Sequence, residues 1–130
     1  MYILVTNNPL VQKEYEGVSK NLTIEFVECP NCLKVLEAAR NHLHQGKRLE
    51  THPMAGSVKP NQNPYKSVIV SDDKSDEEEK NQQILVMENA IMTCKGFLDK
   101  KALPNWEERL LKDFQFVDQS LIQSGVDRIL

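Results

Sequence analysis

The chain has 130 residues, of which 40% are hydrophobic and 27% are charged, and its formal net charge is −3. These values fit one globular domain with a single core, and the absence of a basic stripe argues against a nucleic-acid surface. No apolar run approaches the roughly 20 residues of a membrane span, and three cysteines do not suggest a secreted disulfide framework. We therefore expect a single cytoplasmic domain over residues 1–130 that binds neither nucleic acid nor membrane.

The first half of the chain repeats a strand followed by a helix. Asn8 can cap a helix that begins at Pro9, and the apolar stripe of the next helix ends at Gly46. Two successive strand–helix units predict a parallel pair of strands with a right-handed crossover. The predicted elements are a strand at 2–6, a helix at 10–16, a strand at 22–27, a helix at 31–45 and a short strand at 48–51.

The second half is mainly helical. Ser67–Ser71 predicts one more buried strand, and the acidic run after it predicts a solvated helix start, because acidic side chains offset the positive end of the helix dipole. Pro104 interrupts the helical pattern, and Asn105 with Glu108 predicts the start of the last helix. The apolar stripes are Ile84, Met87, Ile91, Cys94 and Leu98, and then Trp106, Leu110, Phe114, Val117 and Leu121.

These elements predict a small three-layer α/β/α sandwich with a mainly parallel sheet of three or four strands and two C-terminal helices. In open parallel sheets, the loops at the carboxyl ends of the strands form the ligand crevice. In this chain those ends carry Asn7 with Asn8, Cys29, and Ser71 with Asp72. We expect these residues to converge together with the long loop that precedes the last strand.

That loop runs from Thr51 to Ser67 and is rich in Pro, Gly and Asn, and a loop of this length inside a compact domain is usually functional or disordered. Its prolines and apolar residues favour order. Lysines in the loop, with Lys47 and Arg48 nearby, make the region basic, and glycine N–H groups beside a lysine can hold a phosphate or carboxylate. The loop therefore predicts a site for a small anionic ligand, with a proline-braced structural loop as the alternative. The candidate ligand-binding residues are Asn7, Asn8, His52, Gly56, Ser57, Lys59, Asn61 and Lys66.

A second candidate site is the sequence Cys29-Pro30-Asn31-Cys32. Two cysteines with this spacing between a strand and a helix are typical of thiol–disulfide oxidoreductases, because the helix end lowers the pKa of the first thiol. The strands and helices that follow do not match a thioredoxin fold. The structural alternative is that Cys32 packs in the apolar stripe of its helix, as Cys94 does in its own.

The chain also resembles a known family. The residues that carry the resemblance are those of 6–11, of 51–61 and of 63–71. These segments are similar to those of the GrdX family, whose members are small proteins encoded beside the glycine reductase components in amino-acid-fermenting anaerobes. The resemblance implies a cytoplasmic accessory protein of amino-acid-reducing metabolism, and it supplies no catalytic residues.

We therefore expect a binding protein rather than an enzyme, without a cofactor or a metal. Its expected partner is the small anionic ligand or a glycine-reductase-type protein. A homodimer is a further expectation, because Phe116 and Ile122 lie off the last apolar stripe and either widen the core face or supply a dimer contact.

Overall fold

Four strands and four helices make up the described part of the chain. The computed structural model describes residues 1–54, 59–73 and 75–130. The elements in chain order are β1 (Tyr2–Thr6), α1 (Pro9–Tyr15), β2 (Leu22–Phe26), α2 (Leu33–His44), β3 (Arg48–Leu49), β4 (Ser67–Ser71), α3 (Glu77–Lys100) and α4 (Glu108–Ile129). No helix in these ranges is long and apolar enough to cross a bilayer.

Local signals in the sequence explain where several helices begin and end. Asn8 caps α1 as predicted, since its Oδ1 accepts from the N–H of Leu10 at 3.0 Å. Asp76 caps α3 through the N–H of Glu79 at 2.7 Å. The chain leaves α2 through Gly46, whose φ of 97° lies in the left-handed region that a β-carbon disfavours.

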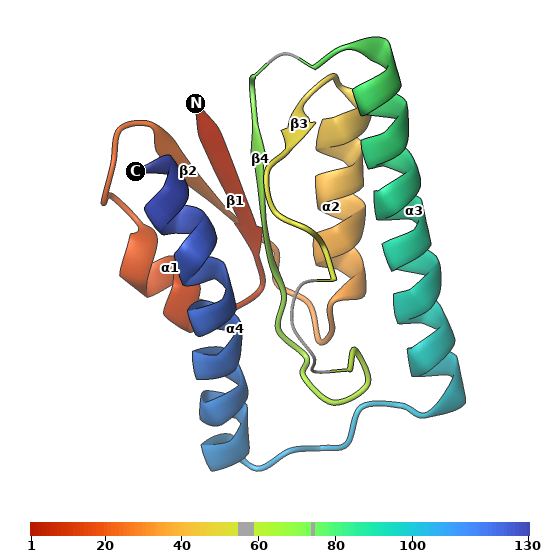
Figure 1. Cartoon of the computed structure of the whole chain (residues 1–130). Helices are drawn as coiled ribbons and strands as arrows, with labels where there is room; N and C mark the ends of the chain where they lie inside the picture. The colour runs from red at the N-terminus through yellow and green to blue at the C-terminus, as the bar shows by residue number, and fades with distance from the viewer. Residues whose placement is uncertain (55–58, 74) are drawn as a thin grey trace.

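The sheet is mixed, and the expectation of a mainly parallel sheet is wrong. The strand order is β2–β1–β4–β3, with β1 parallel to β2 and β4 antiparallel to both of its neighbours. A helix connects β1 to β2, whereas the described part of the loop between β3 and β4 contains none (Figure 1). Without a crossover helix, the chain re-enters the sheet from the end at which it left, so β4 runs antiparallel to β3.

The direction of β4 changes which residues meet at the loop end of the sheet. Ser71 pairs with Tyr2, and the N–H of Asp72 donates to the carbonyl of Met1 at 3.1 Å, so both lie at the opposite end from Asn7. Their expected convergence with Asn7 is therefore wrong. Ser67, at the start of β4, pairs with Thr6 instead.

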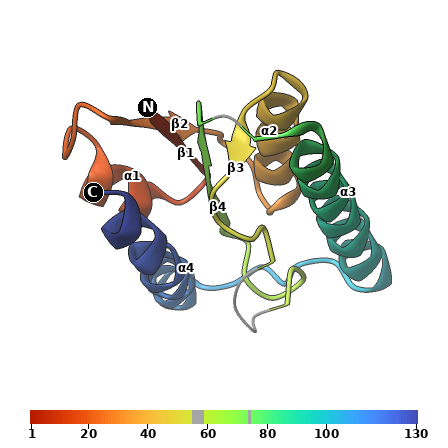
Figure 2. The same cartoon turned by 45° about the horizontal axis from the view of Figure 1, so that its top comes forward.

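Helices cover both faces of the sheet. Figures 1 and 2 show α1 and α4 on one side, and α2 with α3 outside it on the other. Neighbouring residues of a strand point to opposite faces. Leu4 and Ile69 accordingly pack with α1 and α4, whereas Val5, Val68 and Val70 pack with α2 and α3.

Helix α4 differs from its prediction. Its cap is Glu107 rather than Asn105, so it begins at Glu108, and Leu121, which belonged to the predicted stripe, is 40% exposed. The buried face of α4 includes the charged residue Asp118, so a search for apolar periodicity does not find this face. The buried residues of α4 are Asp118, Ile122, Gly125 and Val126. Of the two residues off the predicted stripe, Ile122 packs in the core and Phe116 is 64% exposed.

Candidate functional site

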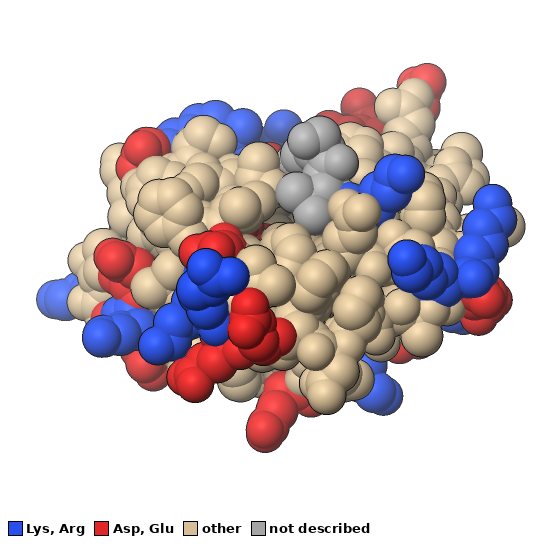
Figure 3. All heavy atoms as spheres, turned by 90° about the horizontal axis from the view of Figure 1, so that it is seen from below, with Lys and Arg blue, Asp and Glu red and all other residues tan. Residues whose placement is uncertain are grey.

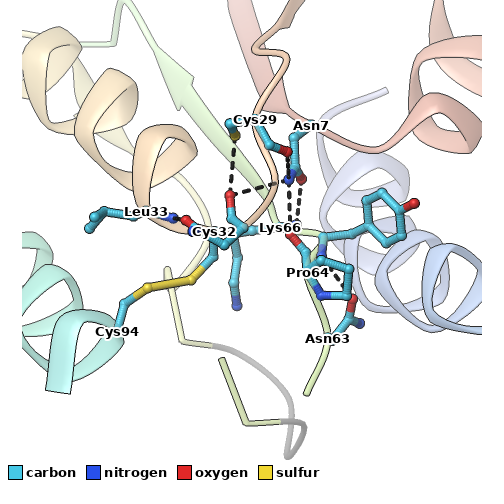
Figure 4. The surroundings of a disulfide bond; sticks show 10 residues. Asn7, Cys29, Cys32, Leu33, Asn63, Pro64, Lys66 and Cys94 are labelled. Atoms are coloured by element: carbon cyan, nitrogen blue, oxygen red, sulfur yellow. Dashed lines mark hydrogen bonds between the residues drawn. A yellow bond between two sulfur atoms is a disulfide. The ribbon is translucent and has the colours of Figure 1, made fainter. Parts of the chain in front are cut away.

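Asn7 joins three segments just beyond the end of β1 (Figure 4). Its side-chain Nδ2 donates to the carbonyl of Pro64 at 2.8 Å. The same nitrogen lies 3.3 Å from the carbonyls of Cys29 and Asn31. Its Oδ1 accepts from the N–H of Lys66 at 2.9 Å. Because one amide group supplies both donors and an acceptor, Asn7 holds the loop against the turn that precedes α2.

A buried chain of hydrogen bonds ends on the carboxylate of Asp118. The N–H of Asn8 donates to Oγ1 of Thr6 at 3.0 Å. This Thr6 oxygen is also hydrogen-bonded to Oγ of Ser67 at 2.7 Å. The Ser67 hydroxyl donates to Oδ2 of Asp118 at 2.7 Å, and the Asn8 amide donates to the same oxygen at 3.0 Å. Burial raises the pKa of Asp118, although these hydrogen bonds and Lys66 oppose the shift. The chain of bonds fixes α4 to the ends of β1 and β4.

Lys66 lies next to this chain of hydrogen bonds. Burial lowers the pKa of its ammonium group, and the nearby Asp118 opposes that shift. Two hollows of about 20 and 30 Å³ adjoin both side chains, and each has room for one or two waters. The Lys66 ammonium group has room beside it only for a compact anion. Such an anion would compete with the Asp118 carboxyl group for Lys66.

The other predicted ligand-binding residues are less connected. His52 is exposed, and its Nδ1 accepts from the backbone N–H two residues later at 3.0 Å. Lys59 is exposed and Asn61 is half-buried. Gly56 and Ser57 lie outside the described residues. Of the predicted set, the structure thus brings Asn7, Asn8 and Lys66 together.

Two of the basic residues expected near the loop lie elsewhere. Lys47 forms an ion pair with Asp72 at the opposite end of the sheet. Nε of Arg48 lies 3.3 Å from a carboxylate oxygen of Glu79 at the start of α3. The loop is therefore less basic than its neighbours in the sequence suggest.

A groove with a volume of about 480 Å³ lies at the same end of the molecule. Trp106 in the α3–α4 linker donates from Nε1 to the carbonyl of Gln62 at 2.8 Å, and its ring centre lies 5.3 Å from that of Phe114. No charged side chain is among the described residues that line the groove. They are Pro30, Asn31, Pro64, Leu98, Ala102, Leu103, Pro104, Asn105, Trp106 and Leu111. Figure 3, which views this end, shows uncharged surface between groups of charged side chains.

The cysteines are not arranged as a Cys29–Cys32 pair. Cys32 forms a disulfide with Cys94, which joins the start of α2 to α3, and Cys29 is a free thiol (Figure 4). The Cys29 thiol donates to the carbonyl of Asn31 at 3.1 Å. Burial raises its pKa, which lowers the thiolate fraction and is the opposite of the activation expected of a nucleophile.

Comparison with known proteins identifies the family. The family model described as GrdX-like protein matches residues 3–127. The chain belongs to the GrdX-like protein family. No curated protein and no solved structure gives a significant match. The match includes the Asn7 junction, Asp118 and the groove.

Two side chains that shape the site of this GrdX-like chain were missed by sequence reasoning. Trp106 was assigned to a helix, and Asp118 was not assigned any role. The signal for Asp118 was its spacing, because residues four apart share a helix face and Asp118 lies four residues before Ile122 and eight before Val126. No comparable local signal placed Trp106 beside Gln62.

Proposed function

We propose that this chain is an accessory protein that binds an uncharged, largely apolar segment of a protein partner in the groove, without catalysing a reaction itself. The observation that carries the proposal is the groove, whose volume of about 480 Å³ lies within the range of ligand sites. Its described lining is mainly apolar and has no charge, which favours a segment of the same character. Membership of the GrdX-like family supports a glycine reductase component as the partner.

The walls of the groove are held in place before any partner binds. Asn7 fixes Pro64 and Asn31 through hydrogen bonds to their carbonyls. Asn63 donates to the carbonyl of Phe114 at 3.2 Å, which connects the loop to α4. A site formed in advance avoids much of the entropy cost of ordering on binding.

The test is to measure binding of purified glycine reductase components to immobilised chain. Leu103→Asp places a charge in the groove, and we expect it to weaken binding at least tenfold, since an apolar partner segment cannot solvate that charge. Val18→Asp is the matched control, because Val18 is 54% exposed and lies between α1 and β2, whose first residue pairs with Tyr2 at the end of the sheet away from Asn7. Absence of binding to the wild type, or an equal loss in both variants, contradicts the proposal.

A spectroscopic readout locates the binding event. Trp106 is the only tryptophan of the chain. Labelling with 5-fluorotryptophan therefore gives a single fluorine resonance that reports from the groove. We expect the bound partner to shift or broaden this resonance, and a complex that leaves it unchanged places the partner elsewhere.

A small anionic ligand at the loop is the second candidate function, supported by the ammonium group of Lys66 beside the two small hollows. A ligand at one hundred times its dissociation constant adds about 2.7 kcal/mol to the free energy of unfolding. A thermal-shift screen with phosphate and small carboxylates compares the wild type with Lys66→Met. Lys59→Ala serves as the exposed control. Stabilisation that Lys66→Met keeps, or no stabilisation of the wild type, rejects this candidate.

A further inference from the structure

Helix α3 has one face that no other described element covers. The helix packs against α2 and touches β3, and Figures 1 and 2 show it as the outermost helix on its side of the sheet. On the outward face Leu85 is 61% exposed and Met92 is 69% exposed. Residues seven apart lie two turns apart on the same side of a helix, so these side chains form an apolar stripe in water.

The same helix has a hollow of about 210 Å³. The residues that line it are Thr93, Gly96, Phe97 and Lys100. Their spacing of i, i+3, i+4 and i+7 is that of the hole which receives a side chain of a second helix in knobs-into-holes packing. Gly96 opens the hollow, since a β-carbon at this position would meet no atom of the described residues within 4 Å.

The two ends of α3 carry opposite charge. The cap residue Asp76 precedes three glutamates in the first turn, at 77–79. The other end carries Lys95, Lys100 and Lys101. The exceptions are Asp99 at this basic end and Lys80 at the acidic end. An antiparallel copy of the helix therefore brings acidic and basic ends together, and the helix dipoles also favour this orientation.

We propose that two copies of this chain form a dimer through antiparallel packing of α3, in which Leu85 of each copy inserts into the hollow at Gly96 of the other. Two-fold symmetry makes both insertions equivalent. If Leu85 of one copy lies opposite Gly96 of the other, the two-fold axis crosses α3 midway between positions 85 and 96 of the helix. Met92 then lies close to this axis. Lys100 of each copy then lies within about one turn of Glu78 of the other. The dimer does not rest on the proposed function, because it uses the outward face of α3, whereas Leu98, the residue of α3 that lines the groove, packs against the core.

The test is sedimentation velocity of the full chain over a wide concentration range. A single helix pair is a small interface, so we expect a weak dimer whose apparent mass rises from 14.9 kDa towards about twice that value. Leu85→Glu should remain monomeric. Gly96→Leu should also remain monomeric, because the new side chain fills the hollow. It should not lower the melting temperature, because replacing glycine inside a helix favours the helix.

Phe116→Glu is the matched control. Phe116 is 64% exposed on α4, so its replacement removes a similar apolar surface from another part of the molecule and should leave the dimer intact. A wild type that stays monomeric at every concentration in low salt overturns the proposal. A dimer that survives both Leu85→Glu and Gly96→Leu, or that only Phe116→Glu abolishes, assigns self-association to another face and also overturns it. Dimerisation should weaken as salt rises, because the paired helix ends are exposed.

Discussion

At the carboxyl end of β1, one side chain holds three segments that are far apart in the sequence. Asn7→Ala removes the donor to three carbonyls and the acceptor for the N–H of Lys66. We expect the free energy of unfolding to fall by about 2–4 kcal/mol, because buried polar groups that lose their partners keep their desolvation cost. Urea denaturation followed by far-ultraviolet circular dichroism measures this change.

Asn41→Ala is the control for Asn7. Asn41 is an exposed residue of α2, so its replacement should change the free energy of unfolding by less than about 0.5 kcal/mol. Equal effects of the two variants would show that Asn7 does not hold the loop.

Asp118 couples stability to pH. Burial raises its pKa, so the folded chain holds a proton on this carboxyl group at pH values where the unfolded chain, with the ordinary value of 3.8, has lost it. The stability contributed by Asp118 is therefore present below pH 3.8 and declines as pH rises through the raised folded pKa. Asp118→Asn cannot titrate. We expect the stability of the wild type relative to this variant to decrease as pH rises, measured by urea midpoints at a series of pH values.

Asp118→Ala separates hydrogen bonding from charge. It removes the acceptor of the Ser67 hydroxyl and one of the two acceptors of the Asn8 amide, which keeps the carbonyl of Gln115, at about 1–3 kcal/mol for each lost bond at every pH. A constant difference between the wild type and Asp118→Asn across the pH series would show that Asp118 does not have a raised pKa.

At the scale of elements, two glycines in helices give opposite predictions. A β-carbon at Gly125 would lie 2.8 Å from the methyl of Thr51 and 3.4 Å from a methyl of Ile69. The Thr51 side chain cannot rotate freely, because its hydroxyl oxygen accepts from the N–H of Ile69 at 3.0 Å. Gly125→Ala should therefore push α4 from the sheet and cost about 1–3 kcal/mol.

Gly96→Ala is the matched change in open space, and we expect it to stabilise by about 0.5–1 kcal/mol through helix propensity. Thermal unfolding measures whether Gly125→Ala lowers the stability and Gly96→Ala raises it. If Gly125→Ala is as stable as Gly96→Ala, α4 does not contact the sheet as closely as described.

Element positions were largely predictable from local signals. The cap at Asn8 and the buried strand Ser67–Ser71 were both predicted and are confirmed. The predicted start of α4 was wrong by two residues, because Asn105 and Glu108 have a capping-box spacing that the chain does not use and the helix is capped at Glu107 instead. Trp106 therefore lies in the linker before α4, and it lines the groove from there.

At the scale of the whole molecule, the Cys32–Cys94 disulfide spans a sequence separation of 62 and encloses the loop with β3 and β4. Closing a segment of this length removes entropy from the unfolded chain, and we expect a stabilisation of about 4 kcal/mol over the reduced form. Urea unfolding with and without reductant measures it.

A thiol count in denaturant distinguishes the two pairings. In the oxidised Cys29→Ser variant, a Cys32–Cys94 bond leaves no free thiol. The predicted Cys29–Cys32 pair would instead leave two free thiols in that variant. The second result would revive the oxidoreductase alternative.

The sequence by itself determined where most strands and helices lie, because caps, prolines and apolar periodicity act between near neighbours. It also determined the family, through residues that lie mostly in the first 71. Only the tertiary structure decided the direction of β4, the buried face of α4, the partner of Cys32 and the groove beside Trp106. These features depend on contacts between distant residues, such as Ser67 with Asp118 and Gln62 with Trp106. Local periodicity carries no information about such pairs, so packing of the whole chain selects them.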